Sequence, residues 1–175
     1  MTQTRRPKTL FILLLFFLWA DAKMLESLLF PARSAGYHFA AALGVPWLHV
    51  VANGLTAAVL IAATVMLWKP SRGWFRAVAV AFGVYLAQTV IGTAVMARNI
   101  EAAISATLIS REQRGMPIRA DDVRSMMSPT AMWLTTLLFA ILIGIALAAA
   151  WRRRDYPDAG AGEPRSPDSR PHASV

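Results

Sequence analysis

Three charged side chains interrupt the first apolar stretch of the chain. Asp21, Lys23 and Glu26 lie within FFLWADAKMLESLLF, residues 16–30. Inside a membrane, such groups are costly unless they are paired, hydrated or neutralised, and they often mark ion or proton pathways. On a helix, Lys23 and Glu26 are about 60° apart, so their i,i+3 spacing allows an ion pair. Asp21 points about 140–160° away from both and has no local partner.

Asp21 is compatible with two environments. It lies either at the outer membrane interface, in contact with water, or in a polar site that it shares with another helix. Lys23 has the additional option of extending its ammonium group toward the interface. The chemistry of this segment therefore depends on what Asp21 faces.

Polar side chains also follow one face in two later segments. His49, Asn53 and Thr56 are spaced i, i+4 and i+7. Further along, Tyr85, Gln88, Thr89 and Thr93 form a second polar stripe. Polar side chains on one face of a membrane helix usually hydrogen-bond to neighbouring helices, so we expect both groups to serve helix packing. The alternative is a path for a solute or a proton.

The sequence gives little support for catalysis or metal binding. It contains no cysteine, and neither an HExxH, a GxSxG nor a phosphate-loop motif is present. Outside the C-terminal tail, the imidazoles are those of His38 and His49. A metal or acid–base site would need them to converge with Asp21 and Glu26. We expect no catalytic residue, cofactor or metal, and a membrane enzyme or metal protein is the least supported alternative.

These residues belong to a chain built for a membrane. Of its 175 residues, 56% are hydrophobic and only 16% are charged, against about 25% in soluble domains. Three runs, 47–68, 77–97 and 130–151, contain no Asp, Glu, Lys or Arg. Each is 21 or 22 residues long, and about 20 apolar residues span a bilayer as a helix. Three membrane spans follow.

A fourth span is predicted at 9–30. From Thr9 to Ala20 a helix would be only about 18 Å long, too short for about 30 Å of hydrocarbon. Extension to Phe30 gives about 33 Å and includes the three charges. We therefore predict an all-α bundle of four transmembrane helices.

A secretory signal peptide is the rival interpretation of the N-terminus. A basic start, an apolar stretch and Ala20-Asp21-Ala22 fit the pattern of a signal peptide with its cleavage site. Because apolar residues resume at Met24 and continue to Phe30, we predict an uncleaved anchor. Cleavage of residues 1–22 is the alternative.

Basic residues near the span ends predict the orientation. The basic residues flank those span ends that would lie on one side of the membrane, and they are Arg5, Arg6, Lys8, Lys69, Arg72, Arg76, Arg152, Arg153 and Arg154. Their positions place both termini in the cytoplasm and the connections 31–46 and 98–129 outside. This placement also argues against nucleic-acid binding despite the net charge of +8. Arginine is much commoner than lysine and alanine is abundant, which suggests a bacterial inner membrane. Residues 1–8 form a basic tail, and residues 152–175 should be disordered.

The connection after the third span keeps a helical pattern. Ile100, Ile104 and Leu108 are spaced by four, so we predict that the third helix extends outward, or that an amphipathic helix lies on the membrane. Residues 119–129 indicate a short helix with acidic residues at its start.

Small residues recur every fourth position in the last two spans. They are Ala79, Gly83 and Ala87 in one span, and Ala140, Gly144 and Ala148 in the other. Such faces allow close helix approach, within a compact bundle or in an oligomer.

Four short fragments resemble a known family. FPARSAG (30–36), LH (48–49), ARNIEA (97–102) and ADDVR (120–124) occur in a four-span layout. This layout resembles a bacterial four-helix integral membrane family of unknown function, related to a human platinum-resistance-associated transmembrane protein. The resemblance covers roughly residues 9–151, and it implies no catalytic residues.

The function we expect is that of a non-enzymatic accessory or interaction protein. Its partners would be the lipid bilayer and either a second copy or another membrane protein. The alternative is a small oligomeric transporter or channel that uses a polar intramembrane site around Asp21 and Gln88.

Overall fold

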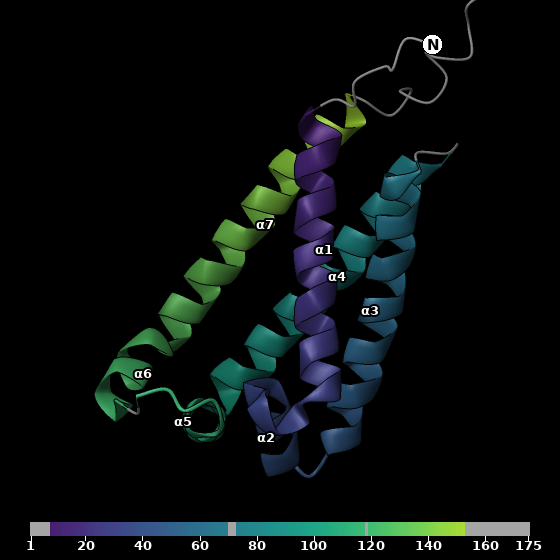
Figure 1. Ribbon diagram of the computed structural model, residues 1–175. Helices are drawn as coiled ribbons and strands as arrows, with labels where there is room; N and C mark the ends of the chain where they lie inside the picture. The colour runs from purple at the N-terminus through teal and green to yellow at the C-terminus, as the bar shows by residue number, and fades with distance from the viewer. Residues whose placement is uncertain (1–7, 70–72, 118, 153–175) are drawn as a thin grey trace, which may run out of the picture.

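The computed structural model describes residues 8–69, 73–117 and 119–152, and in these ranges the chain forms helices and no strand (Figure 1). The predicted all-α class is therefore confirmed. Residues 1–7 and 153–175, which hold most of the predicted basic tail and the predicted disordered tail, lie outside the described residues. In chain order the elements are α1 (Lys8–Leu29), the 3-10 turn η1 (Pro31–Arg33), α2 (Ala35–Ala42), α3 (Pro46–Trp68), α4 (Trp74–Arg98), α5 (Ile100–Gln113), α6 (Ala120–Met126) and α7 (Pro129–Trp151).

Three of the described helices are long and apolar enough to cross a membrane: α3, α4 and α7. They contain the predicted spans 47–68, 77–97 and 130–151. Helix α1 has 22 residues and covers nearly all of the predicted first span, but it carries Lys8, Asp21, Lys23 and Glu26. Its charges set it apart from the other three.

The four long helices alternate in direction, and the short elements gather at one end (Figure 1). The start of α1, the end of α3, the start of α4 and the end of α7 lie at the opposite end. Helix α7 leans away from α3 and is the least buried of the three apolar helices. The buried core lies mainly on α1, α3 and α4, and α7 contributes Ile143 and Ala150 to it.

Aromatic and aliphatic side chains fill the space between α1, α3 and α4. Phe17, Leu60, Trp74 and Phe82 are all almost completely buried. The rings of Phe17 and Phe82 are 5.0 Å apart in an edge-to-face arrangement, which is a favourable geometry for aromatic pairs. Close packing of these buried side chains holds the three helices together.

The predicted extension of the third span is not one continuous helix. Helix α4 ends at Arg98, and Asn99 leaves the helical conformation with φ −125° and ψ 50°. The Asn99 side-chain amide donates to the backbone carbonyl of Val95 (2.9 Å). The backbone carbonyl of Asn99 accepts from Ala103 N in α5 (3.1 Å). This asparagine therefore closes one helix and starts the next, and α5 runs across the end of the bundle (Figure 1).

The two predicted outer connections fold into one layer of short helices, which we call the end layer (η1, α2, α5 and α6). Phe39 of α2 packs with Ala103 and Ala106 of α5 in a small core of its own. The predicted short helix at 119–129 is confirmed as α6, with two aspartates in its first turn. The end layer is therefore an ordered part of the fold.

The Arg33 carbonyl joins η1 to the end of α5 within the end layer. The Arg33 carbonyl in η1 accepts from Ser110 Oγ (2.6 Å) and from Arg114 Nε (2.9 Å), both at the end of α5. Arg114 also pairs with Glu26 of α1 at 3.5 Å. Helix α5 is thus joined to α1 through polar contacts beside the α1–η1 junction.

Candidate polar site of the helix bundle

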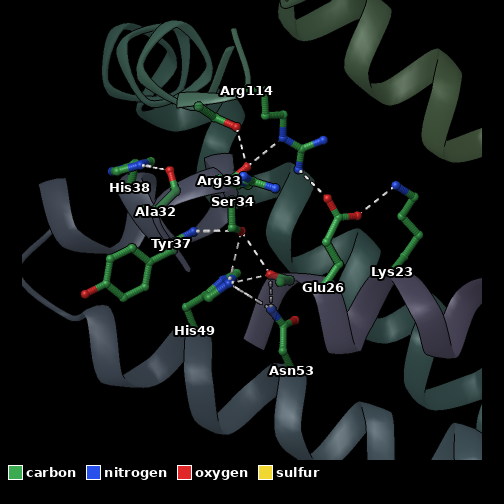
Figure 2. Close-up of polar contacts among 12 residues, drawn as sticks. Lys23, Glu26, Ala32, Arg33, Ser34, Tyr37, His38, His49, Asn53 and Arg114 are labelled. Atoms are coloured by element: carbon green, nitrogen blue, oxygen red, sulfur yellow. Dashed lines mark hydrogen bonds and ion pairs between the residues drawn. The ribbon is translucent and has the colours of Figure 1, made fainter. Parts of the chain in front are cut away.

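A cluster of four polar side chains connects α1, α2 and α3 (Figure 2). His49 Nε2 lies 2.9 Å from Ser27 Oγ and 3.3 Å from Ser34 Oγ. Asn53 Nδ2 is 2.9 Å from the same nitrogen and donates to Ser27 Oγ at 3.2 Å. Ser27 and Ser34 also hydrogen-bond to each other at 2.9 Å. We call these residues the His49 cluster.

The sequence places these groups through a helix cap and a glycine. Ser34 is the N-cap of α2 and accepts from Tyr37 N at 3.3 Å, the usual role of a serine before a helix. Gly36 follows, and a Cβ atom at this position would lie 2.8 Å from His49 Cε1. The absence of a side chain at Gly36 is what allows the imidazole to lie against α2.

The cluster continues through α3 into α4. Asn53 Oδ1 accepts from Gln88 Nε2 at 2.6 Å, and Gln88 Oε1 accepts from Thr56 Oγ1 at 2.6 Å. Asn53 is 5% exposed and Thr56 3% exposed. Both ends of the Gln88 amide are thereby satisfied, as a buried amide requires. The fold thus brings together His49 and Asn53 of the first predicted stripe and Gln88 of the second.

The cluster has part of the geometry of a nucleophile–base pair. A serine hydroxyl within hydrogen-bond distance of an imidazole is one such arrangement, but it normally needs a third group that orients the ring. Among the described residues no carboxylate contacts His49, and its Nε2 already has Asn53 as a neighbour. The arrangement is better suited to holding three segments together than to activating Ser27.

Asp21 lies apart from the His49 cluster. Its side chain is turned toward α3, where its Oδ2 is 2.6 Å from Thr64 Oγ1. Asp21 is 7% exposed, so it is buried inside the chain against α3, and its depth in a membrane stays a prediction. The reason for this burial is the direction predicted from helix periodicity: Asp21 faces away from Lys23 and Glu26, and that direction is toward another helix.

Lys23 and Glu26 form the ion pair that their spacing allows, at 2.9 Å. Figure 2 shows Glu26 between Lys23 and Arg114. These side chains are partly exposed, and an exposed ion pair of this kind contributes little to stability. Their main effect is to neutralise the charge of Glu26 next to the end layer.

The second predicted stripe does not act as a unit. Tyr85 packs its ring against Phe139 of α7 at 5.5 Å, and Thr89 donates to the Tyr85 carbonyl of its own helix. Thr93 instead reaches α7, where its hydroxyl lies 2.8 Å from that of Thr136. Of this stripe, only Gln88 hydrogen-bonds to a member of the His49 cluster, Asn53.

The contact with Thr93 gives a testable role to Thr136. We expect Thr136→Val to destabilise the α4–α7 contact by about 0.6 kcal/mol, the typical contribution of a hydrogen bond between membrane helices. Thr135→Val is the matched control, because Thr135 donates only to the Ala131 carbonyl of its own helix. Unfolding by SDS in mixed micelles measures both, and equal effects would contradict a specific Thr93–Thr136 contact.

The residues named for a metal or acid–base site do not converge. His38 Nε2 lies 2.7 Å from the Ala32 carbonyl, Glu26 pairs with Lys23, and Asp21 contacts Thr64. Within the described ranges, no three His, Cys, Asp or Glu side chains lie close enough together to hold a metal ion. The hypothesis based on His38 and His49 therefore has no geometric support.

An open cavity of about 410 Å³ lies between α3 and α4. It is bordered by small and apolar side chains and one arginine: Ala58, Val59, Ala62, Arg76, Ala77, Val80. None of the predicted site residues lines it. The predicted polar site residues thus form hydrogen bonds elsewhere in the chain and do not line this cavity.

The sequence reasoning missed Ser27, Ser34 and Thr64. Ser27 and Ser34 gave no periodic signal, since one is an isolated serine in a charged helix end and the other is a cap. Thr64 did give a signal. It follows Asn53 by 11 residues, which returns it to within about 20° of the same helix face.

No known protein family matches this chain, and no curated protein and no solved structure is detectably similar to it. The resemblance to the four-helix membrane family therefore stays a prediction. The function must be inferred from the geometry alone.

Proposed function

We propose that the protein crosses the membrane four times, with α1 as a span beside α3, α4 and α7. Helix α1 has 22 residues, about 33 Å, which matches a bilayer. Its first half belongs to the main core through Leu10, Leu13, Leu14 and Phe17. Cleavage after Ala22 would remove these side chains, so an uncleaved α1 agrees better with the fold.

We further propose that both termini are cytoplasmic and that the membrane is a bacterial inner membrane. The start of α1, the end of α3, the start of α4 and the end of α7 share one end of the bundle (Figure 1). The basic clusters of the sequence flank this end, in agreement with the tendency of Lys and Arg to remain inside. The end layer then lies on the outer surface.

The function we propose is that of a non-enzymatic interaction protein whose partner is a second copy or another membrane protein. The observation that supports it most directly concerns the two small-residue faces. A Cβ atom added at Gly83 of α4, or at Gly144 of α7, would meet no neighbouring atom within 4 Å. Within the described residues, Gly83 and Gly144 are thus not packed against another segment, and a helix from outside could approach closely at these two positions.

The state of the polar residues agrees with this proposal. His49, Asn53, Thr56 and Gln88 satisfy one another by hydrogen bonds, which is the usual use of polar groups between membrane helices. The alternative of a transporter or channel with one site around Asp21 and Gln88 is less well supported. The two side chains contact different partners, Thr64 for Asp21 and Thr56 and Asn53 for Gln88.

Gly83→Leu tests the proposed interface. The substitution should weaken self-association or partner binding about tenfold or more, or about 1.4 kcal/mol, because a large side chain blocks close helix approach. It should leave the isolated chain folded, since the added Cβ atom has open space. Light scattering and co-purification in mild detergent measure the association.

Gly92→Leu is the matched control. Gly92 lies on the same helix and also has open space around an added Cβ atom, but nine residues rotate it about 180° away from Gly83. Equal losses for both variants would argue against the Gly83 face. Recovery of the wild-type protein as a monomer without any partner would contradict the proposed function itself.

A further inference from the structure

Asp21 is a buried carboxyl group with an unsatisfied oxygen. Asp21 is only 7% exposed, and its Oδ1 has no hydrogen-bond partner among the described residues. It lies 13 residues after the first residue of α1 and 8 before the last, about 20 and 12 Å along the helix axis. The group is therefore well inside the proposed span, where an ionised carboxylate without a partner costs several kcal/mol.

Within the described residues, Asp21 also lacks a compensating charge. No ionisable side chain of α1 or of the neighbouring elements in these ranges forms a hydrogen bond or ion pair with Asp21. These side chains are Lys8, Lys23, Glu26, Arg33, His49, Lys69, Arg76, Tyr85 and Arg98, and α7 contains no ionisable side chain. The residues beside Asp21 and Thr64 on their helices include the buried, apolar Ala20 and Ala63. In the part of the chain that the structure describes, only the Thr64 hydroxyl forms a hydrogen bond with the Asp21 side chain.

The contacts of Thr64 indicate where a proton lies. Its Oγ1 is 2.6 Å from Asp21 Oδ2 and 3.0 Å from the Leu60 carbonyl. A hydroxyl group has one hydrogen, so it donates fully to only one of two acceptors. If Asp21 is the acid, its O–H donates to Thr64 Oγ1, and Thr64 donates to the Leu60 carbonyl. Both short contacts then contain a hydrogen.

We propose that Asp21 is a reversible proton-binding site inside the membrane, held as the carboxylic acid by Thr64. The Thr64 hydroxyl oxygen accepts a hydrogen bond from the acid O–H, and burial without a cation disfavours the carboxylate. This inference rests on the proposed placement of α1 as a membrane span, but it uses neither small-residue face. A monovalent metal cation is the ligand that would compete with a proton for such a carboxyl group.

Labelling with dicyclohexylcarbodiimide tests this site on the wild-type protein in its membrane. The carboxylic acid gives its proton to one nitrogen of the carbodiimide, and the carboxylate oxygen adds to the central carbon. The acyl group then moves from oxygen to nitrogen, which gives a stable N-acylurea. This is an addition with no leaving group, so the labelled peptide contains every atom of the reagent and mass spectrometry identifies the modified residue.

At neutral pH we expect about tenfold or more label on Asp21 than on Glu26, the other carboxyl group of α1, which is exposed to water and ion-paired. The fraction of acid in an exposed carboxyl falls tenfold per pH unit above its pKa. Labelling of Asp21 should decrease as the pH is raised and be lost in Asp21→Asn. Because the site is mapped in wild-type protein, the test does not depend on the folding of that variant.

Two results would overturn the inference. One is equal or greater labelling of Glu26 at neutral pH, which would mean that Asp21 is ionised. The other is protection of Asp21 by sodium or potassium at constant pH, which would make the site one for a metal cation. Labelling that responds to pH and is unaffected by these ions supports a proton site. Loss of association in Gly83→Leu with unchanged labelling would separate this site from the proposed interface.

Discussion

Replacement of Asn53 by leucine is expected to lower the free energy of unfolding by about 2 kcal/mol. Asn53 contacts Ser27 of α1, His49 of its own helix and Gln88 of α4. Leucine has a similar volume but no polar atom, so the Gln88 amide would keep a buried donor without an acceptor. A buried group left in this state costs about 1–3 kcal/mol, whereas single hydrogen bonds between membrane helices average only about 0.6 kcal/mol. Unfolding by SDS in mixed micelles measures the change.

The double variant Asn53→Leu with Gln88→Leu separates this cost from a general packing defect. Removing both partners leaves no unpaired amide between α3 and α4, so the pair should cost less than the sum of the single changes. Strict additivity of the two effects would mean that the 2.6 Å contact between Asn53 and Gln88 does not couple the helices. A loss below about 0.5 kcal/mol in Asn53→Leu would contradict the central role of this residue.

Gly36→Ala is expected to destabilise the protein by about 1–2 kcal/mol, although alanine favours helices. The helix propensity alone would stabilise α2 by up to about 1 kcal/mol. The new Cβ atom would lie 2.8 Å from His49 Cε1 and 3.0 Å from His49 Nδ1, which is shorter than a van der Waals contact and therefore a steric clash. The ring is held by Ser27 and Asn53, so it can move only by breaking these bonds, and overpacking of this kind costs about 1–3 kcal/mol.

Gly54→Ala is the matched control with the opposite sign. Gly54 lies inside α3, and a Cβ atom there would meet nothing within 4 Å. It should therefore be neutral or stabilising by up to about 1 kcal/mol. Thermal unfolding in detergent, followed by circular dichroism, ranks the two variants. A stabilising Gly36→Ala would show that the imidazole is not confined against α2.

The long helices were predictable from local sequence because their cause is local. Charge-free runs of bilayer length give α3, α4 and α7, since every backbone group in lipid must be satisfied within the segment. The ion pair of Lys23 and Glu26 was predictable for the same reason: its partners are three residues apart on one helix. The same periodicity gave the direction of Asp21 relative to this pair, though not its partner.

Interactions between distant segments could not be predicted from the sequence. Ser27 and His49 are 22 residues apart and meet only because α1 packs along α3. Thr64 and Asp21 are 43 residues apart, and helix periodicity fixes the face of a residue without fixing the helix opposite to it. The end of α4 before Asn99 was not predictable either, since an asparagine within a continuing apolar period is only a weak indication that a helix ends.

The sequence alone determined that this chain forms long apolar helices and which polar residues share a face on each. The tertiary structure decided which of these faces meet: His49, Asn53 and Gln88 form one hydrogen-bonded cluster, whereas Asp21 is buried against Thr64. The physical reason is that a helix is specified by contacts a few residues apart. The partner of a buried polar group is instead specified by the packing of whole helices against one another.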